Sequence, residues 1–167
     1  MPSLQYNLRY TMAHVALQRL DNRTNALGEI LAEFLKIDEV RKQVAAENSG
    51  LGLHYDLGEG HPMLGRRMPD LDLVTADCSL RVFSLLHRAR PVLLNLGEPG
   101  SFDITPWADR VPLIDAKYVG TWELPVIGTV TAPTAVLVRP DGYVAWVGDR
   151  TQIGLAGALT RWFGPPA

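Results

Sequence analysis

Residues 131–148 read TAPTAVLVRPDGYVAWVG and carry the clearest structural signal in the chain. Two runs rich in β-branched and aromatic residues, Thr134–Val138 and Tyr143–Val147, flank the turn sequence RPDG at 139–142. Proline and aspartate favour the early positions of a β-turn, and glycine tolerates the positive φ at its end. This stretch therefore predicts a β-hairpin.

The segments around the hairpin complete a mixed pattern of helices and strands. RPVLLNLG at 90–97 is a near-continuous apolar run, typical of a strand buried on both faces, and VPLIDAKYV at 111–119 is a second strand candidate. We expect 75–89 to form a turn and then a helix, and 153–164 to form a last helix against the sheet. The chain therefore predicts an α/β fold with a central mixed sheet flanked by helices and ending in a β-hairpin and a helix.

That order of elements resembles the thioredoxin-like fold. The resemblance implies a pair of redox cysteines in the loop after the first central strand, here LNLGEPGSFDITPW at 94–107, which contains none. Cys78 is the single thiol of the chain, so thioredoxin-type exchange, which needs two neighbouring thiols, is excluded. The fold also implies a cis-proline opposite this loop, and we expect a cis bond between Ala132 and Pro133.

The first 50 residues predict a helical arm. Apolar residues recur at helical spacing over 3–20 and 26–35 and again after Asp38. We expect Thr24 to cap the second helix, Asp38 to cap the third, and Gly50 to end it. The chain thus divides into an arm at 1–50 and a thioredoxin-like domain without a CxxC motif at 51–167.

Turn residues dominate the start of that domain. LGLHY at 51–55 alternates as a short strand would, and DLDL at 70–73 alternates as a half-buried edge strand would. The glycines and the proline between them force loop geometry. HYDLGEGH at 54–61 gathers two histidines and two acids, but its spacing matches no metal motif, so we expect loop-ordering hydrogen bonds there.

Composition narrows the classes of partner. The 167 residues carry a formal net charge of −2, and basic residues are scattered, which argues against a nucleic-acid partner. No apolar run approaches the roughly 20 residues of a membrane helix, and the N-terminus resembles no signal peptide. These features predict a cytoplasmic protein without a membrane partner.

Several longer motifs resemble one family. They are YDLGEGHPMLGRRMPDLDL at 55–73, SLRVFSLLHRARPVLLNLG at 79–97, VLVRPDGYVAWVG at 136–148 and ALTRWFG at 158–164. All are similar to the C-terminal part of FAD-dependent aromatic hydroxylases, class A monooxygenases of actinobacterial aromatic polyketide pathways. Residues 8–40 resemble the helices that join this part to the flavin and substrate domains, so the resemblance covers nearly the whole chain.

The flavin fingerprint of that family is missing. No GxGxxG follows a strand here, and this motif is what brings a helix N-terminus to the dinucleotide pyrophosphate. We expect no cofactor on this chain, and FAD only if a partner chain supplies it. The initiating Met1 favours a stand-alone gene product.

Candidate site residues come from the two turn-rich regions. The acid–base candidates are His61, Asp70 and Asp103, although Asp103 stands where it would cap a helix at Thr105. Arg66 and Asp70 are interpreted as a structural ion pair or loop anchor. The residues that could contact a ligand or partner are His61, Arg66, Arg67, Trp107 and Pro133.

Two hypotheses of function follow, and a third stays open. The favoured one is a non-redox accessory module in aromatic polyketide tailoring, which binds a second copy or a flavoprotein through helices at 3–47 and could bind an aromatic polyketide. The second is a small cofactor-independent enzyme, of cyclase or dehydratase type, acting on such a polyketide. The third is the C-terminal half of a split flavin-dependent monooxygenase.

Overall fold

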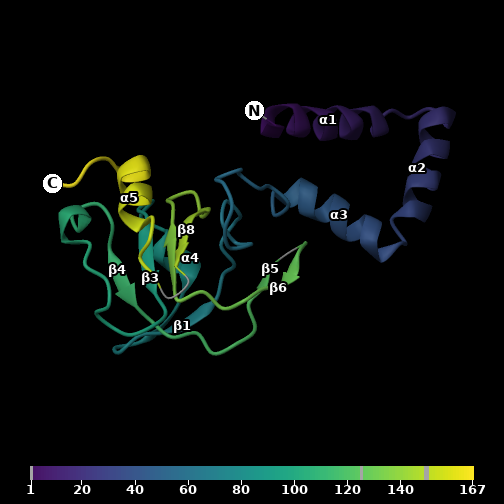
Figure 1. The fold of residues 1–167 in the computed structure, drawn as a ribbon. Coiled ribbons are helices and arrows are strands. Elements are labelled where there is room, and N and C mark those ends of the chain that lie inside the picture. Colours follow the sequence, from purple (N-terminus) through teal and green to yellow (C-terminus); the bar gives the residue numbers. More distant parts are fainter. Residues whose placement is uncertain (1, 125, 149–150) are drawn as a thin grey trace. The chain divides into compact units, whose positions relative to one another are not determined.

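The structure, a computed structural model, describes residues 2–124, 126–148 and 151–167 (Figure 1). It falls into two units, Met1–Leu53 and His54–Ala167, so the division lies after Leu53, whereas the sequence analysis placed it after residue 50. None of the described helices is long and apolar enough to cross a membrane.

The first unit consists of three helices, α1 (Pro2–Leu17), α2 (Asn22–Phe34) and α3 (Asp38–Ser49). The expected caps of α2 and α3 are wrong. Asp21 caps α2, because its Oδ1 accepts hydrogen bonds from the backbone N–H of Arg23 and of Thr24. Asp38 is the first residue inside α3 rather than its cap. The predicted end of α3 is confirmed, since Gly50 has the left-handed φ of 74° that favours glycine.

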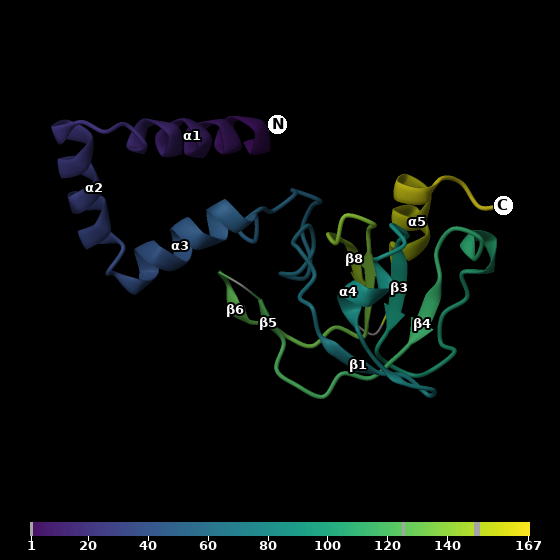
Figure 2. The same ribbon diagram turned by 180° about the vertical axis from the view of Figure 1, so that it is seen from behind.

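The second unit is built on a four-stranded mixed sheet, seen from both sides in Figures 1 and 2. Its strands are β3 (Val92–Asn95), β4 (Leu113–Asp115), β7 (Ala135–Val138) and β8 (Val144–Gly148), in the order β4-β3-β7-β8. β3 is parallel to β4 and antiparallel to β7, and β7 and β8 form the predicted hairpin. This is the thioredoxin-like arrangement, so the predicted fold is confirmed.

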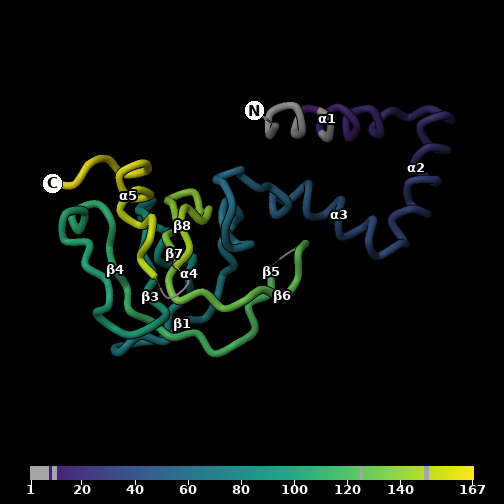
Figure 3. Tube along the Cα trace, viewed as in Figure 1, coloured from purple at the N-terminus to yellow at the C-terminus, as the bar shows by residue number. Residues whose placement is uncertain are grey.

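The connection between the parallel strands carries one turn of 3-10 helix in place of the α-helix of a regular βαβ unit. Between β3 and β4 the chain forms a loop and one turn of 3-10 helix, η1 (Thr105–Trp107). Between β4 and β7 the chain forms a small antiparallel pair of strands, β5 (Glu123–Leu124) and β6 (Gly128–Thr129), both labelled on the tube of Figure 3. The last helix, α5 (Leu155–Phe163), lies where the sequence predicted it.

The region before β3 differs from the expectation at two places. β1 (Asp72–Val74) confirms the edge strand, but it pairs with an unexpected β2 (Ser79–Arg81), and the expected helix shrinks to one turn, α4 (Val82–Leu85). Thr75 Oγ1 accepts a hydrogen bond from the N–H of Cys78 and closes a tight turn, which makes 72–81 a hairpin. The strand expected at 51–55 is absent, because the backbone there bonds to Ala46 and Gly65 rather than to a neighbouring strand.

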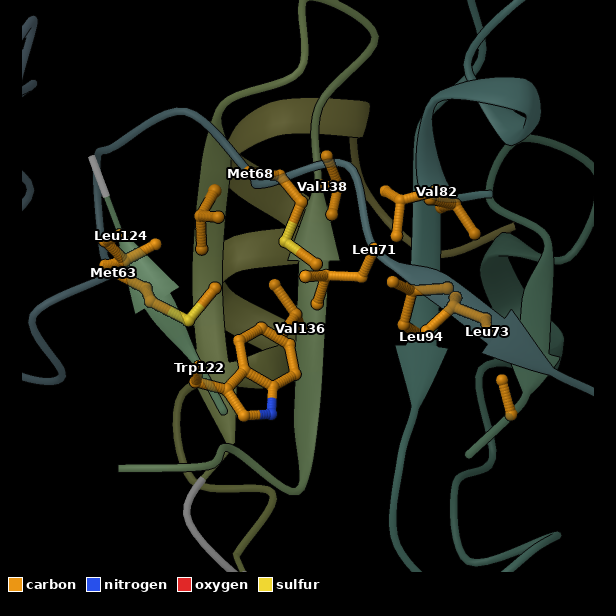
Figure 4. Close-up of a cluster of buried hydrophobic side chains, with 13 residues drawn as sticks. Met63, Met68, Leu71, Leu73, Val82, Leu94, Trp122, Leu124, Val136 and Val138 are labelled. Carbon is orange, nitrogen blue, oxygen red and sulfur yellow. The ribbon is translucent and has the colours of Figure 1, made fainter. Parts of the chain in front are cut away.

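Two buried clusters show that the sheet is covered on both faces. Successive residues of β3 belong to different clusters: Leu94 packs with Val136 and Val138, and Leu93 packs with Leu137 and with Leu155 and Leu159 of α5. Figure 4 shows the first cluster. Burial of each such aliphatic side chain contributes about 1.5–3 kcal/mol. The prediction that β3 is buried on both faces is confirmed.

Candidate functional site

The loop after β3 is organised around a buried amide. The side chain of Asn95 is 1% exposed, and its Nδ2 donates to the carbonyl of Glu98 at 2.7 Å, to Ser101 Oγ at 3.2 Å and to Asp115 Oδ1 at 2.6 Å. Its Oδ1 accepts from the N–H of Gly97 at 3.1 Å. Hydrogen bonds of a neutral amide therefore hold the loop that carries cysteines in redox-active members of the fold. Sequence analysis missed Asn95, although a polar residue ending an apolar strand is a usable signal.

The segment opposite this loop lies where the fold resemblance placed it. The carbonyl of Thr134 accepts from the N–H of Leu96 at 2.9 Å, so the residue after Pro133 touches the start of the loop. The expected cis bond is wrong, because no described peptide bond is cis. Trans is the more stable isomer of an X–Pro bond unless packing selects the other. Pro133 is buried and offers little surface to a ligand.

Asp103 and Trp107 have structural partners at the far end of the loop. The carboxylate of Asp103 accepts hydrogen bonds from Oγ1 of Thr105 at 2.7 Å and from the backbone N–H of Thr105 at 3.0 Å. Thr105 is the first residue of η1. The hydroxyl of Thr105, and then its N–H, lower the pKa of Asp103 below the ordinary value of 3.8. Asp103 thus bonds to the first residue of η1, but the expected cap is off by one position, because the N-cap residue is Ile104 and makes no side-chain capping bond. Trp107 is buried, and its Nε1 donates to the carbonyl of Gly164 at 2.9 Å.

Asp70 anchors the β1–β2 hairpin to α4. Its Oδ2 accepts from Arg81 Nε at 2.8 Å, and its Oδ1 accepts from the N–H of Phe83 at 2.9 Å. The predicted loop anchor is confirmed, but Arg66 as its partner is wrong. The reason is topological: β2 pairs with β1, which returns Arg81 and the start of α4 to the neighbourhood of Asp70.

His61 is held by backbone groups at both ring nitrogens. Its Nδ1 accepts from the N–H of Met63 at 3.2 Å, which assigns the proton to Nε2, and Nε2 then donates to the carbonyl of Thr131 at 2.9 Å. His61, Asp70 and Asp103 are therefore bonded to three different parts of the chain. No shared acid–base centre is evident among these hydrogen bonds.

A cavity of about 630 Å³ lies between the segment 54–66 and β6. The residues that line it are His54, Gly58, Glu59, Gly60, His61, Pro62, Leu64, Arg66, Ile127, Thr129 and Val130. The segment GHPMLGRRMPD thus supplies much of its wall. Within the part of the chain that the structure describes, no group of three His, Cys, Asp or Glu side chains could hold a metal ion.

Arg66 is held in place by its backbone while its side chain lines this cavity. Its carbonyl accepts from the N–H of Val144 at 2.9 Å, and its own N–H donates to the carbonyl of Met63 at 3.0 Å. The residue is half-buried, and its guanidinium makes no hydrogen bond or ion pair to any described residue. Arg67 differs, because its guanidinium lies 5.6 Å from the centre of the Phe83 ring and it is not among the cavity-lining residues.

Comparison with known proteins places these features in a family. The family model of the aromatic-ring hydroxylase C-terminal domain matches residues 61–166. This chain belongs to that family. The aromatic-ring hydroxylase C-terminal domain is a thioredoxin-like unit in this chain, and Asn95 stands at the start of the loop where redox-active members of the fold carry cysteines, bonded to Asp115 at the end of β4.

The relatives of this aromatic-ring hydroxylase C-terminal domain are much longer proteins. A 12-dehydrotetracycline 5-monooxygenase/anhydrotetracycline 6-monooxygenase of Streptomyces rimosus is 41% identical over 164 residues, which are 96% of this chain and 32% of the relative. A dialkyldecalin synthase of Streptomyces rugosporus is 32% identical, over 94% of this chain and 28% of its own length. The solved OxyS anhydrotetracycline hydroxylase from Streptomyces rimosus superposes with a TM-score of 0.78 at 38% identity, over 99% of this chain and 34% of that one. The chain therefore spans about a third of these relatives.

Proposed function

We propose that this chain is a non-redox accessory module of aromatic polyketide tailoring in the cytoplasm, and that helices α1–α3 bind the apolar surface of a partner protein. The observation that carries the proposal is the exposure of the arm. Large apolar side chains of α1 and α2 face outward: Met12 is 64% exposed, Ile30 54% and Phe34 53%. Patches of this kind mark interaction surfaces.

The arm also lacks a core that could stabilise it alone. Among the arm side chains that the structure describes, Ala46 is the one buried residue. Two of its helices, α2 and α3, have 13 and 12 residues, and isolated helices shorter than about 12–15 residues are marginal in water. A partner surface would supply the missing burial.

The partner that the comparisons favour is a flavoprotein body. The relatives share the sequence of the arm within chains about three times as long, so in them the arm has further protein to pack against. FAD would then be held by that body rather than by this chain. A second copy of this chain is the other surface that could cover the arm.

Replacement of Leu27, Ile30 and Phe34 by serine tests this role. Co-purification with the first two thirds of the anhydrotetracycline hydroxylase, and light scattering of the chain alone, show which partner the unaltered chain binds. The triple variant should lose that interaction. The control replaces Glu29 and Glu33 of the same helix by serine and should leave the complex intact. A chain that stays monomeric with both candidate partners, while circular dichroism shows a folded arm, would contradict the proposal.

A second candidate is a cofactor-independent cyclase or dehydratase. The similarity to a dialkyldecalin synthase favours it, because that relative's name denotes the making of a ring system. The hydrogen bonds that hold His61 and Asp103 weigh against it, since neither group is free to move a proton as it stands. Turnover of a pathway intermediate should vanish in His61→Ala and Asp103→Ala if this function holds, and activity in both variants would rule it out.

A further inference from the structure

We propose that the cavity between 54–66 and β6 binds the carboxylate of a small, flat aromatic acid, with Arg66 as the anchoring group. This proposal concerns the second unit alone and does not depend on the partner of the arm. It rests on an unpaired cation, on the shape of the cavity and on the side chains of its walls.

The unpaired cation is the first argument. An arginine guanidinium stays protonated at any ordinary pH, and a partly buried charge without an acceptor is unfavourable. Arg66 is half-buried, and no described residue accepts a hydrogen bond from its side chain. A carboxylate matches the planar guanidinium with two parallel N–H···O bonds, which makes it the acceptor best suited to this position.

The backbone holds Arg66 ready for such a ligand. Two backbone hydrogen bonds join Gly65 and Arg66 to Val144 of β8. The Gly65 N–H donates to the Val144 carbonyl, and the Val144 N–H donates to the Arg66 carbonyl, each at 2.9 Å. Gly65 has a φ of 74°, and a Cβ there would lie 2.0 Å from the carbonyl oxygen of Tyr55. The loop that presents Arg66 is therefore closely packed and costs little to organise on binding.

The walls select an apolar ligand of limited size. Pro62, Leu64, Ile127 and Val130 supply apolar surface on both sides of the cavity. Its volume of about 630 Å³ lies within the roughly 300–1,000 Å³ of small-molecule sites, enough for a compact aromatic system. Thr129 and His54 add polar side chains to the lining, and His54 Nε2 is already bonded to the carbonyl of Leu64 at 3.0 Å.

The carboxylate of Glu59 should repel a bound carboxylate and therefore offers a second test of the site. Its exposed carboxylate lines the same cavity, yet it lies beyond ion-pair distance of Arg66. Removing the negative charge should strengthen binding of a carboxylate, whereas removing Arg66 should weaken it. A general change in stability would not raise the affinity in one variant and lower it in the other.

The probe is 1-hydroxy-2-naphthoate, titrated into the full chain by calorimetry and by amide NMR, with 1-hydroxy-2-naphthamide as the uncharged analogue. We expect the acid to shift the amide signals of Gly58, Gly60, Ile127 and Val130 and not that of Gly157 in α5. Arg66→Gln should weaken binding about tenfold or more, as expected for loss of a hydrogen bond to a charged group. Glu59→Gln should strengthen binding about twofold to fivefold at low salt.

Arg67→Gln is the matched control, since it removes an equal charge at the next residue outside the cavity lining. It should leave the affinity within about twofold, because its guanidinium lies over the Phe83 ring rather than in the cavity lining, and salt screens charges that do not touch the ligand. If both arginine variants weaken binding equally, the loss of affinity reflects only the change in net charge, and the proposal is overturned. Equal affinity for the acid and the amide, or no shift of the four amides, would overturn it as well.

Discussion

Asn95 Nδ2 donates to Asp115 Oδ1 over 2.6 Å and so ties together the ends of the parallel strands β3 and β4. The same carboxylate accepts from the N–H of Gly100 at 3.3 Å. The contacts of two side chains therefore fix both the strand ends and the loop between them. The loop keeps the position of a thioredoxin-like redox site, while the groups that organise it have no redox chemistry.

Replacement of Asn95 by alanine should destabilise the second unit. The substitution leaves buried groups without their partners, and we expect the free energy of unfolding to fall by about 2–3 kcal/mol. Urea unfolding followed by circular dichroism measures this. Ser101→Ala is the control, because it removes only one of the three acceptors of Nδ2 and should cost under about 1 kcal/mol. Equal stability of Asn95→Ala and the unaltered chain would show that the amide network is dispensable.

Alanine substitutions at Gly65 and Gly100 distinguish the cost of a steric clash from the cost of a left-handed backbone conformation. Both have positive φ, 74° and 72°, but a Cβ at Gly65 would meet the Tyr55 carbonyl at 2.0 Å, whereas at Gly100 nothing lies within 4 Å. Gly100→Ala should cost only the left-handed conformation, about 1–2 kcal/mol. Gly65→Ala should cost clearly more and should shift the amide signals of residues 54–66. Similar costs in thermal unfolding would contradict the close packing of this loop.

The Asp70 carboxylate should matter more than its ion pair. Asp70→Ala removes the acceptor of both Arg81 and the Phe83 N–H, and we expect a loss of about 2 kcal/mol. Arg81→Ala removes an exposed ion-pair partner and should cost under about 1 kcal/mol. Chemical unfolding of the two variants gives the comparison. A larger loss for Arg81→Ala would mean that the ion pair, rather than the backbone contact at α4, holds this region.

Asp103 should show its depressed pKa in an acid titration. Because the folded state favours the ionised carboxylate, its contribution to stability is present above about pH 3.8 and is lost as the pH falls through the lower folded pKa. Carboxyl NMR should place the midpoint below 3.8 in the unaltered chain. Thr105→Val removes the stronger of the two causes and should raise the midpoint, whereas Thr105→Ser keeps a hydroxyl and should not. An unchanged midpoint in Thr105→Val would contradict the assigned cause.

Prediction from the sequence succeeded where the signal is local. The turn residues at 139–142 and the apolar strands beside them predicted the hairpin, because turn type depends on a few adjacent residues. The near-continuous apolar run in RPVLLNLG at 90–97 predicted burial on both faces, since a strand with one wet face alternates. The absence of a CxxC motif followed directly from the cysteine count.

The errors at 51–55 and at Arg66 share one cause, which is contact with residues distant in the sequence. LGLHY at 51–55 alternates like a strand, but a strand needs a neighbour, and the backbone bonds instead to α3 and to Gly65. Arg66 is close to Asp70 in sequence, yet the β1–β2 hairpin brings Arg81 to that carboxylate. A polar residue at the end of an apolar strand is a signal for Asn95, but its contacts could not be read from the sequence, because three of its partners come from the loop and one from the next strand.

The sequence by itself determined the order of elements, the hairpin, the buried central strand and the loss of dithiol chemistry, because these depend on residue identity and short-range spacing. Tertiary structure alone decided which groups each polar side chain contacts. It turned His61 and Asp70 into structural anchors and left Arg66 facing a cavity without an acceptor. The physical reason is that hydrogen bonds and ion pairs act over a few ångströms, and only the folded chain brings distant residues within that range.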